Sequence, residues 1–224
     1  MKLSKETLEL LANFQKINNG IVIKATPSGN DSTIIKTINR EMKSYAEAEI
    51  METFDSNVVL YDLQGFININ SLFEESDMEF TDKYVLIKKD HSEIRIMYAS
   101  TDTVIHPEKD YPAMPSSAEF NLDKATMKDC VNASKFLDCD YIVLSVDEND
   151  NIVILSKDPR RPESNQFKKV LCSAGGNKFE DVAFKREFLT FIEDDYRVSI
   201  KPVGIEFRSI AKPNNFYFLT KETV

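Results

Sequence analysis

The chain has 224 residues, and 28 lysines and arginines against 37 aspartates and glutamates give it a formal net charge of −9 at pH 7. Hydrophobic residues make up 42% of the sequence, and there are only 6 glycines and 8 prolines, which supplies a core and excludes fibrous and disordered classes. No apolar run approaches the roughly 18 residues that a membrane-spanning helix needs, and the first residues are too charged for a signal peptide. We therefore expect a cytoplasmic protein without a membrane partner.

The first half of the sequence predicts one helix followed by three strands, and then a second unit with a similar order. Residues 4–18 carry apolar side chains at helical spacing behind Ser4, a residue type that caps helices. Period-two patterns and turn residues predict the remaining elements: strands at 21–23, 33–38, 45–50 and 58–61, a helix over 62–73, and strands near 77–80, 83–88 and 93–98.

The second half predicts two further units of this kind. A strand at 119–122 leads into a helix that Asp123 caps and that runs to about residue 137. The other expected elements are strands at 141–146, 152–155 and 167–173, a segment 178–184 leading into a helix near 185–193, and strands at 196–200, 204–210 and 216–220.

A proline-containing stretch separates the two halves. Pro107, Pro112 and Pro115 lie within residues 101–116, and proline continues neither a helix nor a central strand. We interpret this stretch as an extended connector between domains at 1–100 and 117–224. The predicted fold class is α+β, with two similar domains of two β-α-β-β-β units each, in which the helices pack against sheets.

Cations form a stripe on the predicted third helix. Lys124, Lys128 and Lys135 recur at helical spacing, whereas Met127 and Cys130 belong to an apolar stripe on the same helix. A lysine stripe on any single helix is usually an ordinary solvated face.

Two other predicted helices also carry cations. On the first helix, Lys5, Asn13 and Lys16 lie away from the apolar face. Lys185 and Arg186 begin the predicted fourth helix, where a cation is unfavourable because the N-terminal end of the helix dipole is positive. In a chain of net charge −9, this recurrence indicates one basic face for an anionic polymer. The acidic runs are predicted to occupy turns away from that face, at 74–77, 147–150 and 193–195.

No arrangement for catalysis or metal binding is visible. The three cysteines are odd in number and lack a Cys-x-x-Cys spacing, so neither a disulfide framework nor a zinc site is expected. His91 and His106 lie in a predicted hairpin and in the connector, with no nucleophile placed beside them. We expect a protein that is not an enzyme and that has no metal or cofactor.

The N-terminal third closely resembles the sliding clamps of T-even-type tailed bacteriophages. The resemblance spans roughly residues 1–72 and agrees beyond them mainly in element order. It rests on Met1-Lys2-Leu3-Ser4-Lys5-Glu6-Thr7, Leu10-Leu11, Asn13-Phe14, Ile17-Asn18, Gly20-Ile21, Tyr45-Ala46-Glu47-Ala48, Tyr61-Asp62-Leu63, Gly65-Phe66 and Ser71-Leu72.

The resemblance implies a DNA polymerase processivity factor with the DNA clamp fold. Such proteins form rings of three subunits joined head to tail, with helices on the inner face and antiparallel sheets outside. The ring encircles duplex DNA without reading its sequence, is opened by an ATP-dependent clamp loader, and tethers the replicative DNA polymerase through a C-terminal peptide. It acts in the cytoplasm of the infected bacterial host, and the resemblance leaves open whether transcription proteins also bind it.

The resemblance also assigns roles to particular residues. The residues expected to face DNA are Lys5, Lys16, Lys124, Lys128, Lys135, Lys185 and Arg186. At the subunit interface, edge strands of the two domains are expected to meet through Ile94, Ile96, Tyr98, Phe167 and Val170. The connector residues expected to bind a partner peptide are Val104, Ile105, Tyr111 and Met114.

Each of these assignments has a plainer alternative. The strand residues are core positions of one subunit in the alternative interpretation, and the connector is then a packed linker. For the whole chain, the alternatives are a monomeric two-domain protein-binding module and, more remotely, a metal-independent hydrolase.

Overall fold

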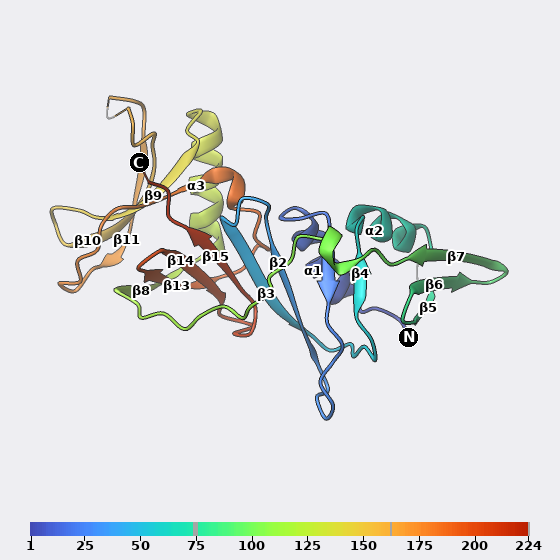
Figure 1. The fold of residues 1–224 in the computed structure, drawn as a ribbon. Helices are drawn as coiled ribbons and strands as arrows, with labels where there is room; N and C mark the ends of the chain where they lie inside the picture. The colour runs from blue at the N-terminus through green and yellow to red at the C-terminus, as the bar shows by residue number, and fades with distance from the viewer. Residues whose placement is uncertain (74–75, 162, 224) are drawn as a thin grey trace. The chain divides into compact units, whose positions relative to one another are not determined.

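The computed structural model describes residues 1–73, 76–161 and 163–223, and Figure 1 shows the arrangement of their helices and strands. The chain forms two compact units, Met1–Asp110 and Tyr111–Val224. The division falls within the stretch predicted to be the connector. Glu74 and Glu75, which belong to the first predicted acidic run, lie outside the described residues.

The two helices of the first unit begin at side-chain caps. Helix α1 spans Lys5–Gln15, and the Ser4 hydroxyl accepts a hydrogen bond from the Thr7 N–H at 3.1 Å. Helix α2 spans Leu63–Leu72, and the Asp62 carboxylate accepts one from the Gly65 N–H at 2.9 Å. The helices contact each other and bury their apolar stripes. The buried apolar residues of the two helices are Leu10, Leu11, Phe14, Leu63 and Phe66.

Antiparallel strands complete the first unit. They are β1 (Ile21–Ile23), β2 (Thr33–Ile38), β3 (Ser44–Ile50), β4 (Val58–Leu60), β5 (Asp77–Phe80), β6 (Tyr84–Lys89) and β7 (Ser92–Met97). Strand β1 pairs with β4, β2 pairs with β3, and β5, β6 and β7 form a sheet in which β7 is an edge. A short 3-10 helix, η1 (Thr101–Thr103), follows.

The second unit has one α-helix and two sheets. Helix α3 spans Lys124–Phe136 and contacts β9 (Tyr141–Val146), β10 (Asn151–Ser156) and β11 (Phe167–Ser173). These strands and β12 (Val182–Lys185) form a sheet in the order β11-β10-β9-β12, so β11 is an edge. The other four strands are antiparallel neighbours in the order β8 (Ala118–Leu122), β13 (Tyr196–Lys201), β14 (Gly204–Ser209) and β15 (Phe216–Thr220).

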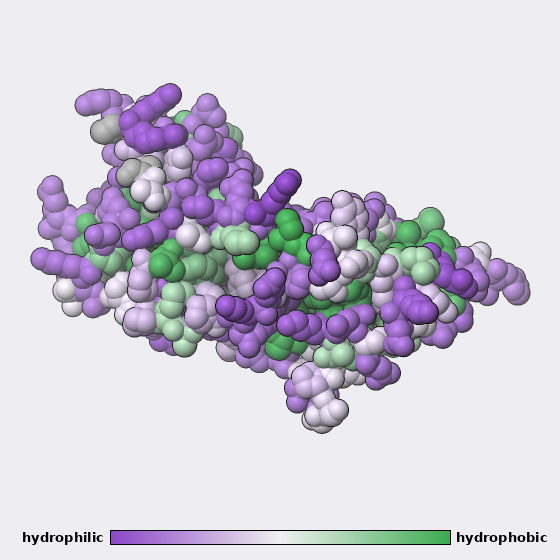
Figure 2. Space-filling view, viewed as in Figure 1, coloured by the Kyte–Doolittle hydropathy of each residue, from purple (hydrophilic) through white to green (hydrophobic). Residues whose placement is uncertain are grey.

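The core of the second unit is rich in aromatic rings. Phe184 and Phe207 meet edge to face with ring centroids 6.1 Å apart, and Phe191 stacks on Tyr217 at 4.3 Å. Gly204 allows the close approach of β14 to β15, because a Cβ atom there would lie 2.1 Å from the Leu219 carbonyl oxygen. The surface in Figure 2 is mainly hydrophilic, with separate apolar patches.

The prediction of a fourth helix near 185–193 is wrong. Lys185 ends strand β12, and only the 3-10 helix η2 (Arg186–Phe188) follows it. The apolar spacing of Phe188, Phe191 and Ile192 imitates a helix, but tertiary contacts hold the segment in another conformation. The Tyr217 hydroxyl accepts a hydrogen bond from the Ile192 N–H at 3.3 Å, and the Tyr196 hydroxyl donates to the Ile192 carbonyl at 2.5 Å. The fourth unit therefore lacks its α-helix, while the α+β class and the antiparallel sheets are confirmed.

Candidate nucleic-acid and subunit interfaces

Helix α3 presents its cations to solvent because its other face is anchored in the core. Asp123 caps the helix by accepting hydrogen bonds from the Thr126 hydroxyl at 2.7 Å and the Thr126 N–H at 2.8 Å. These bonds hold the pKa of Asp123 below its usual value. Cys130 and Ser134 are fully buried. The remaining face carries the exposed side chains of Lys124, Lys128 and Lys135, as predicted.

The three lysines of α3 border a hollow of about 200 Å³ within the second unit. Its apolar floor includes Met127 and Phe191, and its opposite wall is formed by the non-helical segment that follows η2. Within the part of the chain that the structure describes, no salt bridge reaches the ammonium groups of these lysines. Their charge is therefore available to an anion that approaches from solvent.

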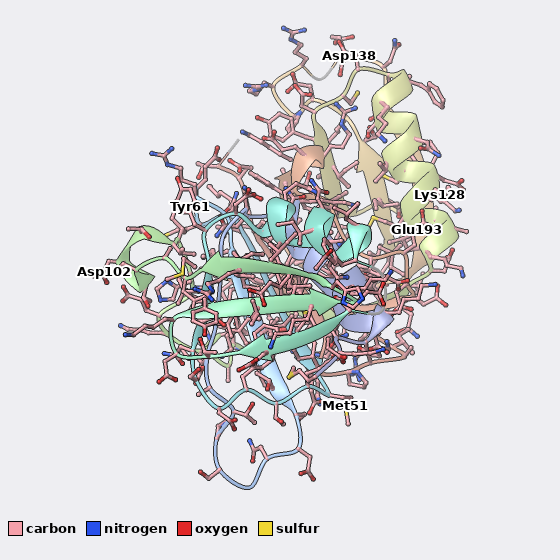
Figure 3. The ribbon with its side chains drawn as sticks, turned by 90° about the vertical axis from the view of Figure 1, so that its right-hand side faces the viewer. Met51, Tyr61, Asp102, Lys128, Asp138 and Glu193 are labelled. Carbon is pink, nitrogen blue, oxygen red and sulfur yellow. The ribbon has the colours of Figure 1, made fainter. Side chains whose placement is uncertain are left out.

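Acidic side chains lie beside these lysines, which corrects the predicted separation of charges. Glu193 and Asp194 line the same hollow, and Figure 3 shows Lys128 and Glu193 close together at the same end of α3. The Asp195 carboxylate accepts a hydrogen bond from the Lys124 N–H at 2.8 Å. The acidic run 193–195 thus borders the basic face, because the non-helical segment after η2 lines the hollow beside α3.

The first helix offers a weaker cationic surface. The Lys5 ammonium lies 3.8 Å from the Glu9 carboxylate one turn later, and both side chains are largely exposed. Lys16 is exposed at the C-terminal cap of α1. Asn13, which the sequence placed on the outer face, is instead 5% exposed. Helix α2 bears no lysine or arginine.

Lys185 and Arg186 are neutralised by acids of the same chain. The Lys185 ammonium lies 3.2 Å from the Glu187 carboxylate and 5.7 Å from the centre of the Phe188 ring. The Arg186 guanidinium lies 3.6 Å from the Asp140 carboxylate. Neither residue belongs to an α-helix. Their expected contribution to attracting phosphate is therefore smaller than that of the α3 lysines.

The predicted interface residues of the first unit lie on or beside the edge strand β7. Ile94 and Ile96 are half-buried and pair with Ile87 and Val85, which are fully buried. Tyr98 follows the strand, and it packs against a buried cluster of valines in the same unit. Its hydroxyl is buried and has no hydrogen-bond partner among the described residues, and burial raises the pKa of Tyr98.

The predicted interface residues of the second unit lie on the edge strand β11. Phe167 is half-buried, whereas Val170 is 53% exposed and lies opposite the buried Val153 of β10. The register of β10 and β11 shifts between Ile152 and Val153, which leaves an irregularity in the edge strand. Each unit thus presents an edge strand that carries apolar side chains.

The predicted peptide-binding residues have different surroundings. Val104 is 5% exposed and belongs to the buried valine cluster, so its side chain is closed to a partner, whereas Ile105 is exposed. Tyr111 contacts the rings of Phe216 and Phe218, each with a centroid separation of 5.1 Å, and burial raises its pKa. The backbone carbonyl of Met114, a half-buried residue, accepts a hydrogen bond from the Lys201 ammonium at 3.0 Å.

Some exposed apolar residues were missed by the sequence reasoning, and two of them lie at the ends of α3 and β7. Phe136, at the end of α3, is 88% exposed, and Met97, at the end of β7, is 62% exposed. The helical period could have predicted that Phe136 is exposed, because Phe136 lies outside the stripe that contains Cys130 and Ser134. Within the described ranges, no cluster of three His, Cys, Asp or Glu side chains suits a metal ion, and no helix is long and apolar enough to cross a membrane.

Comparisons with known proteins agree with this architecture. A family model described as DNA polymerase processivity factor matches residues 4–106. The sliding clamp of Vibrio phage KVP40 is 30% identical over 92% of this chain and 92% of its own length. The sliding clamp of Enterobacteria phage T4 is 33% identical over 68% of this chain and 65% of its own length.

Solved structures share the fold at low sequence identity. A. fulgidus PCNA, bound to the C-terminal region of FEN-1, has a TM-score of 0.70 at 10% identity and covers 97% of this chain and 95% of its own. The DNA polymerase III beta chain of Streptococcus pneumoniae has a TM-score of 0.71 at 14% identity, with 99% of this chain and 64% of its own aligned. The fold is thus the DNA clamp fold, and the chain belongs to the sliding clamp family of T-even-type phages, which are DNA polymerase processivity factors.

Proposed function

We propose that three copies of this chain join head to tail into a ring that encircles duplex DNA and tethers the replicative DNA polymerase. The observation that carries the proposal is the pair of open edge strands, β7 in one unit and β11 in the other. Because these edges differ in sequence, pairing β7 of one copy with β11 of the next is a heterologous contact, and such contacts close into rings when the rotation allows. Edge pairing also covers backbone groups that would otherwise favour aggregation.

The ring would hold DNA by topology and by weak electrostatic contacts. The exposed Lys124, Lys128 and Lys135 supply positive charge on one face of α3, with further cations at Lys5 and Lys16. Phosphate contacts position a protein on a duplex without reading its sequence, which suits movement along DNA. The neighbouring Glu193 and Asp194 limit how strongly the α3 face attracts phosphate.

Other parts of this function involve partners. A closed ring cannot thread onto circular DNA, so an ATP-dependent clamp loader opens it in this proposal, while the chain catalyses nothing. The polymerase is tethered through its C-terminal peptide at connector residues, among which Ile105 is exposed. The structure of A. fulgidus PCNA with the C-terminal region of FEN-1 supports the use of a partner's C-terminal segment for binding. The proposed location is the cytoplasm of the infected bacterial host, and transcription proteins are additional candidate partners.

The first test is the absolute mass of the protein by light scattering, over a dilution series that starts at tens of micromolar. A mass near three times 25.7 kDa supports the ring. Primer extension on a primed circular template, with polymerase and loader, then measures product length with and without the clamp. A monomeric mass at every concentration together with unchanged product length would contradict the proposal and favour a monomeric protein-binding module.

A further inference from the structure

A second hollow, of about 360 Å³, lies wholly within the first unit. Its walls include strand β2, the loop that joins β1 to β2 (blue in Figure 1), and connector residues 106–110. A volume of this size is in the range of ligand pockets. None of the residues assigned to DNA or subunit contacts lines this hollow.

Three lysines give the hollow a positive lining. They are Lys24, Lys36 and Lys109, and the acidic residues of the lining are Glu49 and Asp110. The Glu49 carboxylate already accepts a hydrogen bond from the Ser32 hydroxyl at 2.5 Å. The Lys36 ammonium has one acidic neighbour from β3, Glu47, at 3.6 Å.

The connector places a carboxylate of its own on this positive lining. The Asp110 carboxylate lies 2.5 Å from the Lys36 ammonium, and the Asp110 side chain is 92% exposed, whereas that of Lys36 is 22% exposed. Hydrogen bonding and the charge of Lys36, with the charge of Lys24, lower the pKa of Asp110. Because the Asp110 carboxylate is exposed to water, its attraction to Lys36 is screened and the carboxylate is readily exchanged. Lys36 is thus a half-buried group held in place by the fold, whereas the Asp110 carboxylate bound to it can be replaced by another anion.

The connector is anchored on both sides of Asp110, because Tyr111, the next residue, packs on the rings of Phe216 and Phe218. Val104 is buried in the valine cluster, and the Asn18 side-chain amide donates a hydrogen bond to the Ile105 carbonyl at 2.6 Å. His106 Nδ1 lies 2.8 Å from the Val104 carbonyl oxygen. The Asp110 side chain is exposed, so its carboxylate can rotate away from Lys36 without moving these anchors.

Apolar surface next to the lysines indicates the kind of ligand. Ile34 is 40% exposed in the lining, and Pro27 and Pro107 add further apolar atoms. A small inorganic anion would use the lysines alone and leave this surface in water. A peptide that carries an acidic residue beside an apolar one uses both features.

We propose that this hollow binds an acidic and apolar peptide segment of a partner protein, whose carboxylate replaces Asp110 on Lys36. In this arrangement the connector occupies its own docking site until the partner arrives, so Asp110 is a competitor of the ligand. The site differs from the connector residues considered for the polymerase peptide, and the proposal holds whether or not the chain forms a ring.

The test measures binding of a fluorescein-labelled peptide of alternating glutamate and valine to the full chain, by fluorescence anisotropy. A peptide with glutamine at every glutamate position is the matched ligand control. We expect the glutamate peptide to bind more tightly, Lys36→Gln to weaken it about tenfold through loss of a charge-assisted hydrogen bond, and Asp110→Asn to strengthen it severalfold. Lys83→Gln, an exposed lysine outside the hollow, is the control for net charge.

The opposite signs of the two substitutions make the proposal refutable. If Asp110→Asn binds the peptide no more tightly than the parent, Asp110 is not a competitor and the proposal fails. Equal losses for Lys36→Gln and Lys83→Gln would show a general charge effect and also overturn it. A single-stranded oligonucleotide that displaces the peptide and depends more strongly on Lys36 would identify the site as a nucleic-acid site instead. Lys24→Gln repeats the test without touching the Lys36 ion pairs.

Discussion

Replacing Arg95 by proline should weaken the proposed subunit contact while leaving the unit folded. Strands β6 and β7 pair antiparallel, and the Tyr98 N–H donates to the Lys83 carbonyl at 2.9 Å. Because hydrogen-bonded pairs alternate along an antiparallel ladder, Ile94 and Ile96 also bond toward β6, and the backbone groups of Arg95 point to the open edge. Proline at Arg95 therefore removes one outward N–H and no bond within the sheet.

The size of the effect follows from a carbonyl group of the neighbouring subunit, which loses the Arg95 N–H as its hydrogen-bond donor. A buried acceptor left without a hydrogen bond costs about 1–3 kcal/mol, so about 2 kcal/mol is expected for each contact. This corresponds to roughly a thirtyfold weaker contact. Light scattering over a dilution series should show the mass falling toward 25.7 kDa at higher protein concentrations than for the parent.

Arg95→Ala is the matched control, because it removes the same exposed side chain and keeps the N–H. The Arg95 guanidinium lies 4.8 Å from the centre of the Tyr84 ring, and both variants lose that contact equally. Thermal unfolding of the two variants should agree, which would show that the strand is intact. If both variants have the parent's mass at every concentration, the β7 edge is not the subunit contact.

Two further predictions concern α3. In a plot of log affinity for a fluorescent duplex against log salt concentration, Lys128→Gln should reduce the slope by about 0.9 per lost phosphate contact. Lys185→Gln should change the slope less, because Glu187 lies 3.2 Å from that ammonium, and equal slopes for the two lysine variants would contradict the assignment. Glu193→Gln should raise the affinity for the duplex. Asp123→Ala should lower the free energy of unfolding by about 1 kcal/mol at pH 7, while Asp123→Asn should lower it less. Because the folded pKa of Asp123 is lowered, the stability that Asp123 contributes is present above its unfolded pKa of about 3.9 and is lost as pH falls through the folded pKa. The difference in free energy of unfolding between the parent and Asp123→Ala should therefore narrow below about pH 4. A difference that stays constant with pH would refute this cause.

Local patterns predicted most of the secondary structure, because those elements follow from short-range preferences. Ser4 and Asp123 cap helices where expected, and the exposed stripe of Lys124, Lys128 and Lys135 follows from helical spacing alone. The prediction failed where distant aromatic rings decide the conformation. The spacing of Phe188, Phe191 and Ile192 is helical, but Tyr196 and Tyr217 bind the backbone of this segment and stop a helix from forming.

The residues by themselves determined the α+β class, the three α-helices and the identity of the candidate cations. Only the tertiary structure decided which of those charges remain available. It placed Glu193 beside Lys128, paired Lys185 with Glu187 and Arg186 with Asp140, and set the connector's Asp110 against Lys36. The physical reason is range: capping and periodicity act within a few residues, whereas Coulomb interactions depend on distances that only the folded chain establishes.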